Sequence, residues 1–202
     1  MREVLRLGVV LLVICAVAGA VLAFVNGITS DRIAAQATIK LEQALRDVLP
    51  EADEFRDEQE ALQELKQEAS QEGKPRFTIT DKMYTGYSQG ERRGFAFMCS
   101  PSGYGGPIET VVGVSSDRKV SGVSVIRHTE TPGLGANIAN REFQMRFVGI
   151  PVGTEVKVKK DGGDIDAITG ATVSSRAVAN AVNEALQVFE VVTDKGAPEN
   201  EL

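Results

Sequence analysis

The sequence predicts an α+β fold, in which an N-terminal transmembrane helix precedes an antiparallel sheet with flanking helices. The run from Leu7 to Val25 is apolar or small and carries no charge, close to the ~20 residues that cross a bilayer. Between residues 77 and 127, short segments enriched in β-branched and aromatic residues are separated by glycines. A later segment, from Thr172, has apolar residues at helical spacing. Strands followed by a helix set to one side predict this class.

Composition limits the function classes. The 202 residues suit one ordinary domain with an appendage, and the net charge of -6 argues against a nucleic-acid partner. Cys15 and Cys99 form no CxxC pair, and His128 is the only histidine. We therefore expect no disulfide framework and no metal site, and we nominate no catalytic residue.

The charges around the apolar run predict its orientation. Arg2 and Arg6 precede it and residues 26–31 are not basic, so the positive-inside rule places the N-terminus in the cytoplasm. A cleavable signal peptide is the main alternative, since small residues occur at 16–18 and 20–23. The apolar run is longer than a usual signal core, which favours a retained anchor. Bulky Ile14 before the cysteine disfavours a lipoprotein.

The chain divides into four predicted parts. Residues 1–28 form the transmembrane anchor, and 29–76 form a helical, charged connecting segment. Within the latter, the stretch from Glu51 to Glu72 is rich in acidic residues and glutamine, which is typical of a solvated helix. Residues 77–192 form the folded domain, and 193–202 form a polar C-terminal tail.

The folded domain contains several predicted strands and two helices. The predicted strands are Phe77–Thr80, Lys82–Thr85, Phe95–Met98, Ile108–Val114, Val120–Arg127 and Glu155–Lys159. Residues 115–119 predict a hairpin connection between two of them. A short helix, capped by Asn140, is expected over residues 141–147. The last helix should bury one face, formed by Val178, Val182, Leu186 and Phe189.

The chain is organised around the stretch from Asp166 to Thr172, where a strand-like run leads into the last helix. Thr172, Ser174 and Ser175 are candidates for the helix N-cap. Amide groups at a helix N-terminus and the helix dipole attract anions such as phosphate. Gly170 and Ala171 leave space for a ligand to approach the backbone. On this chemistry alone, an ordinary capped turn is the simpler interpretation.

Three motifs resemble those of one family of flavoproteins. Asp166-x-x-Thr-Gly-Ala-Thr172 resembles the flavinylation signature Asp-x-x-(Ser/Thr)-Gly-Ala-(Ser/Thr) of the FMN-binding domains in Rnf and Na⁺-pumping NADH:quinone oxidoreductase complexes. Residues 104–108 (Tyr-Gly-Gly-Pro-Ile) and 128–135 (His-Thr-Glu-Thr-Pro-Gly-Leu-Gly) resemble two further motifs of these domains, in the family's order. The anchor and the short chain are most similar to the RnfG (RsxG) family of the Rnf complex. The NqrC family of the Na⁺-pumping reductase is the alternative.

The resemblance implies the ligand and its site. Thr172 would carry FMN through a phosphoester bond, and the loop from Thr131 to Gly135 would contact the ring. In that loop Pro132 would fix the backbone, Gly133 and Gly135 would permit close approach, and Leu134 would pack on the ring. The remaining expected contacts are Lys160, Asp166, Thr169, Gly170, Ala171 and Val173. For the loop of residues 131–135, the alternative interpretation is a glycine-rich turn that follows a strand and binds nothing. For Lys159 and Lys160, the alternative is a pair of solvated lysines at a strand end. His128 could orient the loop through Glu130 or simply lie at the end of the preceding strand.

The resemblance also implies partners and a location. A threonine hydroxyl is a poor nucleophile without a base, so a separate FAD-dependent, Mg²⁺-requiring flavin transferase would attach the FMN. The chain would relay electrons within a membrane Rnf complex, linked to ferredoxin and NAD and coupled to Na⁺ or H⁺. Other Rnf subunits and membrane lipid would be its partners. The FMN domain would lie on the periplasmic side of the bacterial inner membrane.

Two further hypotheses belong to other functional classes. The first is a non-redox, membrane-anchored assembly subunit, in which the Thr-Gly-Ala-Thr turn serves only to begin a helix. The second is a secreted domain that binds a small ligand and is released by signal cleavage.

Overall fold

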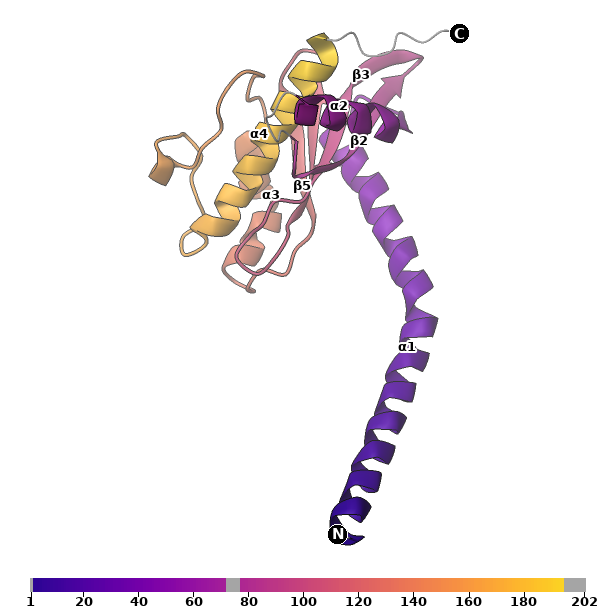
Figure 1. Cartoon of the computed structure of the whole chain (residues 1–202). Coiled ribbons are helices and arrows are strands. Elements are labelled where there is room, and N and C mark those ends of the chain that lie inside the picture. The colour runs from indigo at the N-terminus through magenta and orange to yellow at the C-terminus, as the bar shows by residue number, and fades with distance from the viewer. Residues whose placement is uncertain (1, 72–76, 195–202) are drawn as a thin grey trace. The chain divides into compact units, whose positions relative to one another are not determined.

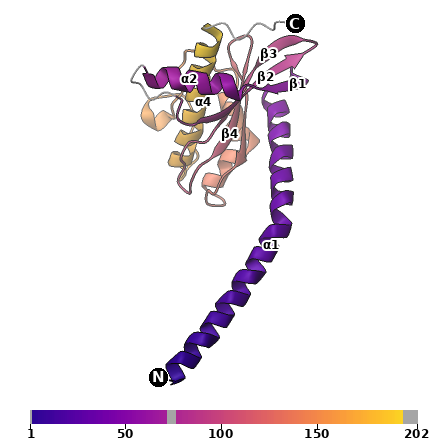
Figure 2. The same ribbon diagram turned by 45° about the vertical axis from the view of Figure 1, so that its right-hand side comes forward.

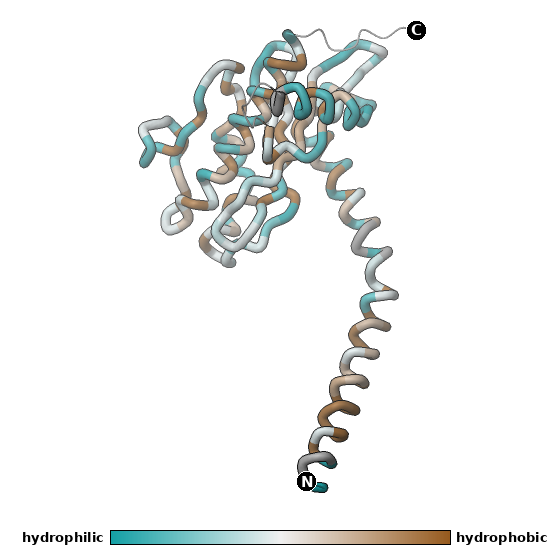
Figure 3. Tube along the Cα trace, in the orientation of Figure 1, coloured by the Kyte–Doolittle hydropathy of each residue, from teal (hydrophilic) through white to brown (hydrophobic). Residues whose placement is uncertain are grey.

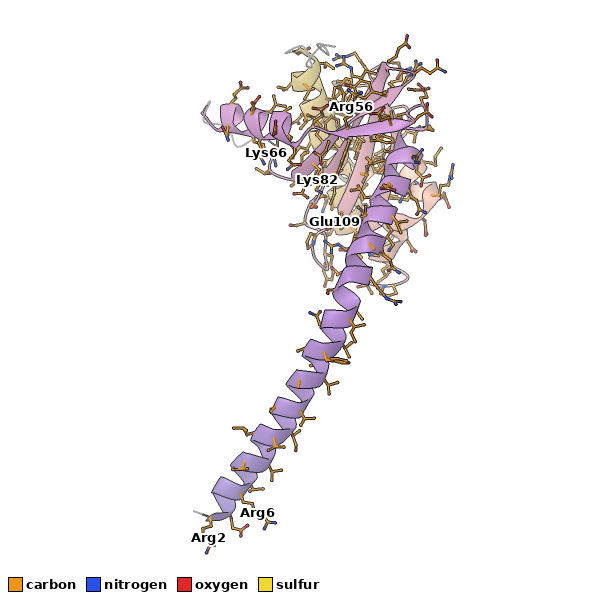
Figure 4. The ribbon with its side chains drawn as sticks, turned by 90° about the vertical axis from the view of Figure 1, so that its right-hand side faces the viewer. Arg2, Arg6, Arg56, Lys66, Lys82 and Glu109 are labelled. Atoms are coloured by element: carbon orange, nitrogen blue, oxygen red, sulfur yellow. The ribbon has the colours of Figure 1, made fainter. Side chains whose placement is uncertain are left out.

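The computed structural model describes residues 2–71 and 77–194 and divides the chain after Leu41 into two units. The first unit is the larger part of helix α1 (Arg2–Val48), whose early residues are mostly hydrophobic (Figure 3). The large apolar side chains there are half or more exposed. Arg2 and Arg6 lie at its N-terminal end (Figure 4). By length and composition, α1 is the one helix among the described residues that could cross a membrane.

The second unit contains a five-stranded antiparallel sheet with the order β1-β2-β3-β4-β5 (Figure 1). Every strand pairs with its neighbours in sequence, as in a meander. The strands are β1 (Glu54–Asp57), β2 (Thr80–Ser88), β3 (Glu91–Cys99), β4 (Glu109–Ser115) and β5 (Val120–Arg127). With its flanking helices, this sheet confirms the α+β prediction.

Helices α2 (Gln59–Gln71) and α4 (Thr172–Asp194) lie on the same side of the sheet (Figure 2). The predicted apolar face of α4 is confirmed, because all four of its residues are buried. The ring of Phe189 meets that of Phe95 on β3 edge to face, with 5.7 Å between the centroids. Burial of these side chains anchors α4 to the sheet and thereby positions its N-terminus.

The opposite face of the sheet is covered by the end of α1 and the residues after it. Val48 and Leu49 are buried against strand glycines. A Cβ on Gly113 would lie 2.3 Å from the carbonyl oxygen of Val48, and one on Gly122 would lie 2.6 Å from the Cα of Val48. The Ser121 hydroxyl also donates to that carbonyl oxygen, at 2.5 Å. These glycines let the chain lie directly on the sheet.

Two predicted elements are wrong. Residues 54–57, interpreted as helix, form β1, which pairs with β2. Residues 155–159 form no strand, although Val156 and Val158 are buried as their alternation suggested. The side-chain amide of Asn183 on α4 bonds both the backbone N–H and the carbonyl of Val156, at 2.7 Å each. This side chain therefore takes the place of a neighbouring strand.

Other elements differ from prediction at their ends. Of the strand expected over Phe77–Thr80, only Thr80 is in a strand, and it begins β2, which also contains the strand expected over Lys82–Thr85. At the start of β2, the Glu184 carboxylate accepts hydrogen bonds from the backbone N–H groups of residues 79 and 80. The helix expected over residues 141–147 consists of α3 (Arg141–Gln144) and the 3₁₀ turn η2 (Met145–Phe147). Asn140 precedes α3, but its side chain makes no capping hydrogen bond.

Candidate functional site

A cavity of about 520 Å³ lies where three loops meet, within the usual size range of ligand pockets. Strands β3 and β5 run in the same direction and both end at one edge of the sheet, so the loops that follow them start close together. The N-terminus of α4 completes the wall. The lining residues are Tyr104, Glu130, Thr131, Leu134, Gly135, Gly170, Ala171, Thr172, Val173 and Ser174.

Glu130 connects the three segments that form the cavity. Its side chain is part of the wall, yet the residue is only 5% exposed. Oε1 accepts a hydrogen bond from the backbone N–H of Gly105 at 2.9 Å, and Oε2 accepts one from the Ser174 hydroxyl at 2.5 Å. The backbone N–H of Glu130 donates to Nδ1 of His128 at 3.3 Å. His128, which directly follows β5, is therefore in hydrogen-bond contact with the backbone of this loop.

The glycines around Glu130 provide space for its carboxylate. A Cβ on Gly135 would lie 2.4 Å from Oε2, and a Cβ on Gly103 would lie 2.4 Å from Oε1. Gly133 has a different reason to be glycine, because its φ of +75° is a left-handed conformation with open space around it. The two glycines of the loop thus have separate functions: Gly133 allows the turn, and Gly135 leaves space for the Glu130 carboxylate.

Thr172 is the first residue of α4 and lines the cavity. Lys160 donates from Nζ to the Thr172 hydroxyl oxygen at 3.1 Å. The turn η3 (Lys159–Asp161) presents this lysine, and Arg176 holds the turn through two hydrogen bonds to Asp161, each 2.6 Å long. The Arg176 guanidinium lowers the pKa of Asp161. A cation and a helix N-terminus therefore converge on one hydroxyl group.

The turn before α4 is fixed by its own hydrogen bonds. Ser175 donates to the carbonyl of Ala171 at 2.9 Å and accepts from the backbone N–H of Ile168 at 3.0 Å. Ser174 and Ser175, expected at the N-cap, therefore lie inside α4 and bond other partners. Gly170, at φ +79°, turns the chain into the helix beside Leu134.

Asp166 lies on the surface, away from the lining of the cavity. Its carboxylate accepts a hydrogen bond from Lys159 at 2.8 Å, which lowers the pKa of Asp166. Its carbonyl accepts one from Arg146 at 2.6 Å. These contacts fix the start of the signature but direct Asp166 to solvent.

The structure brings together most of the expected site residues. Seven of them line the cavity: Thr131, Leu134, Gly135, Gly170, Ala171, Thr172 and Val173. Lys160 reaches the site through its bond to Thr172. Four are outside the lining: Pro132, Gly133, Asp166 and Thr169. Sequence reasoning assigned no place in the lining to Tyr104, Glu130 or Ser174. Tyr104 and Glu130 stand inside the quoted motifs, which was the available signal.

The chemistry of the wall fits FMN. Tyr104, Leu134 and Val173 are large apolar side chains with exposed fractions of 78%, 47% and 44%, and they suit a flat aromatic ring. The amide groups at the start of α4 and the ammonium group of Lys160 suit a phosphate. Among residues 2–71 and 77–194, no group of three or more His, Cys, Asp or Glu side chains could hold a metal ion.

Comparisons with known proteins agree with this assignment. The sequence model of the FMN-binding domain family matches residues 103–187, and the sequence model of the RnfG N-terminal region matches residues 1–48. The G subunit of the Na⁺-translocating ferredoxin:NAD⁺ oxidoreductase complex of Acetobacterium woodii is 34% identical over 195 residues, which are 94% of this chain and 93% of that protein. The G subunit of the ion-translocating oxidoreductase complex of Methanosarcina acetivorans is 34% identical over 187 residues, 92% and 94% of the two chains.

Among solved structures, NqrC of Shewanella oneidensis has a TM-score of 0.49 at 22% identity. The similarity covers 57% of this chain and 61% of that one.

Proposed function

Because this chain belongs to the family of G subunits of ion-translocating oxidoreductase complexes, we propose that it relays electrons through an FMN bound in the cavity beside α4. The chain is part of such a membrane complex, with the other subunits as its partners. Its similarity to RnfG-type proteins over more than nine-tenths of its length disfavours the NqrC alternative. In the Acetobacterium complex, the named reaction links ferredoxin to NAD⁺ and moves Na⁺.

The observation that carries this proposal is the position of the Thr172 hydroxyl in the cavity wall, in contact with Lys160. FMN is attached there as a phosphoester of Thr172. Lys160 and the N-terminal amides of α4 then balance the phosphate charge. Leu134 and Val173 provide apolar surface for the ring, which supplies one- and two-electron chemistry.

Attachment requires an external enzyme, because no carboxylate or imidazole contacts the Thr172 hydroxyl among the hydrogen bonds of the described residues. A flavin transferase that uses FAD and Mg²⁺ supplies the activation. The pyrophosphate bond of FAD breaks, the bond between the Thr172 oxygen and the FMN phosphorus forms, AMP leaves and the hydroxyl proton is released. Exposed Asp166, with Thr169 of the same signature, is placed for recognition by that enzyme.

The anchor places the cofactor outside the cytoplasm. Arg2 and Arg6 keep the N-terminus in the cytoplasm, α1 crosses the inner membrane in contact with lipid, and the FMN domain lies on the periplasmic side. The proposed parts are the anchor (1–28), the connecting segment (29–76), whose later residues join the sheet through β1, the FMN-binding domain (77–192) and the tail (193–202). Residues 72–76 and 195–202 lie outside the described residues. A covalent bond retains the cofactor where no free FMN is supplied.

Intact mass spectrometry of the full-length chain, co-expressed with a flavin transferase, tests this function. Wild type should carry one FMN as a phosphoester, and Thr172→Ala should carry none. Thr154→Ala is the control, because it removes an exposed threonine hydroxyl outside the cavity lining and should retain the FMN mass. A wild-type chain that matures without FMN while assembling into its complex would instead support a non-redox assembly protein. Loss of residues 1–25 would support the secreted domain.

A further inference from the structure

A carboxylate in the cavity wall is held by hydrogen-bond donors and belongs to no ion pair of the described residues. Glu130 accepts one hydrogen bond from a backbone N–H and one from a serine hydroxyl. None of the ion pairs formed within residues 2–71 and 77–194 includes it. Most carboxylates on the wall of a ligand cavity can turn toward water, but this residue is 5% exposed.

The position of this carboxylate is tightly determined. Gly103 and Gly135 face its two oxygens, and an added Cβ at either glycine would come within 2.4 Å. Gly105 and Ser174 fix the same two oxygens through hydrogen bonds. The negative charge of Glu130 therefore has a defined place on the wall, which a solvated surface carboxylate does not have.

We propose that the fixed negative charge of Glu130 lowers the reduction potential of the flavin bound in this cavity. The inference rests on the proposed function and extends it from binding to redox tuning. Uptake of two electrons from a reductant and one proton from solvent adds one negative charge to the ring. A fixed negative charge on the wall opposes this uptake, and burial reduces the screening by water.

The expected effect is measurable. The carboxylate and the reduced ring each carry one negative charge. If they lie roughly 10 Å apart at an effective dielectric constant of about 20, their repulsion lowers the equilibrium constant for flavin reduction by on the order of tenfold. For a two-electron couple, a tenfold change corresponds to about 30 mV. The N-terminus of α4 offsets part of the charge, since Ser174 lies in its first turn.

The test is a spectroscopic redox titration of the full-length, flavinylated chain in detergent, with dithionite as reductant. Glu130→Gln keeps the side-chain shape and an oxygen for the N–H of Gly105 but removes the charge. The equilibrium constant for flavin reduction should rise on the order of tenfold. Glu130→Asp keeps the charge and should stay within about threefold of wild type. Glu91→Gln removes a surface carboxylate paired with Arg93 and should leave the constant unchanged.

The outcomes separate this inference from the proposed function. A wild-type chain without FMN would overturn both. A flavinylated Glu130→Gln chain with the wild-type potential would overturn only the inference. Equal shifts in the Gln and Asp variants would also overturn it, because packing rather than charge would then set the potential. Should the Gln variant fail to fold, the Asp variant decides: because it keeps the charge, its constant must stay within about threefold of wild type, and a larger change would overturn the inference.

Discussion

Substitution of Gly135 tests the contact that joins the loop of residues 131–135 to α4. In Gly135→Ala the new Cβ would lie 2.4 Å from Oε2 of Glu130, 2.8 Å from the Ser174 hydroxyl oxygen and 2.9 Å from Cβ of Glu130. The last atom belongs to the rigid start of a buried side chain, so the carboxylate cannot simply swing away. The loop must move from α4 or the hydrogen bond to Ser174 must break.

The cost can be worked from these contacts. Overpacking of a well-packed site costs typically about 1–3 kcal/mol, and a hydrogen bond to a charged group contributes about 1.5–3 kcal/mol. Because one movement relieves part of both, we expect Gly135→Ala to lower the free energy of unfolding by about 2–4 kcal/mol. Gly133→Ala is the matched control in the same loop. It introduces only the left-handed conformation, which costs about 1 kcal/mol.

Urea unfolding of the full-length chain in detergent, followed by far-ultraviolet circular dichroism, measures both variants. Intact mass gives the FMN content, which should fall more for Gly135→Ala. A double-mutant cycle with Ser174→Ala identifies the cause, because both single variants disturb the same hydrogen bond and their costs should not add. The reasoning is refuted if Gly135→Ala costs no more than Gly133→Ala, or if the costs of Gly135→Ala and Ser174→Ala are additive.

Two further predictions concern groups outside the cavity wall. Burial raises the pKa of the Cys99 thiol to about 12. Iodoacetamide should therefore modify Cys99 in a Cys15→Ser chain only after unfolding. Rapid labelling of the native chain, measured by mass, would contradict this. The pKa of Asp161 is lowered by Arg176, so its contribution to stability is present above about pH 4 and lost as the pH falls through the lowered pKa. Asp161→Asn should therefore flatten the acid side of the unfolding free energy against pH, and an unchanged curve would argue against the pair.

The sequence predicted best the elements that local patterns determine. The strand from Val120 to Arg127 has the predicted ends, because its neighbours are a tight hairpin and a glycine-rich loop. The face of α4 follows from helical spacing alone. Six of the seven predicted lining residues lie in two continuous motifs, and Val173 directly follows the second, so each motif brings neighbouring residues to the wall.

Non-local contacts explain what the sequence did not predict. Strand β1 has no alternation of its own and is held by pairing with β2, in which Arg56 lies over the ring of Tyr87. The segment around Val156 has the alternating valines of a strand, but its backbone pairs with the side chain of Asn183 and not with another strand. That partner lies 27 positions away and has no signal in the segment itself. The bond between Glu130 and Ser174 joins residues 44 positions apart, so no local pattern could reveal it.

The Glu130–Ser174 bond also explains why the loop motif and the α4 motif depend on each other. Thr172 can present its hydroxyl to a phosphate only if the start of α4 has a fixed position, and Ser174 fixes that position through Glu130. Gly135, which follows Leu134, has no side chain, and this lets the loop lie against Glu130 and Ser174. One buried carboxylate therefore contributes to the distance between Leu134 and Thr172, the two ends of the proposed FMN site. A cofactor bound at both ends needs that distance to be constant.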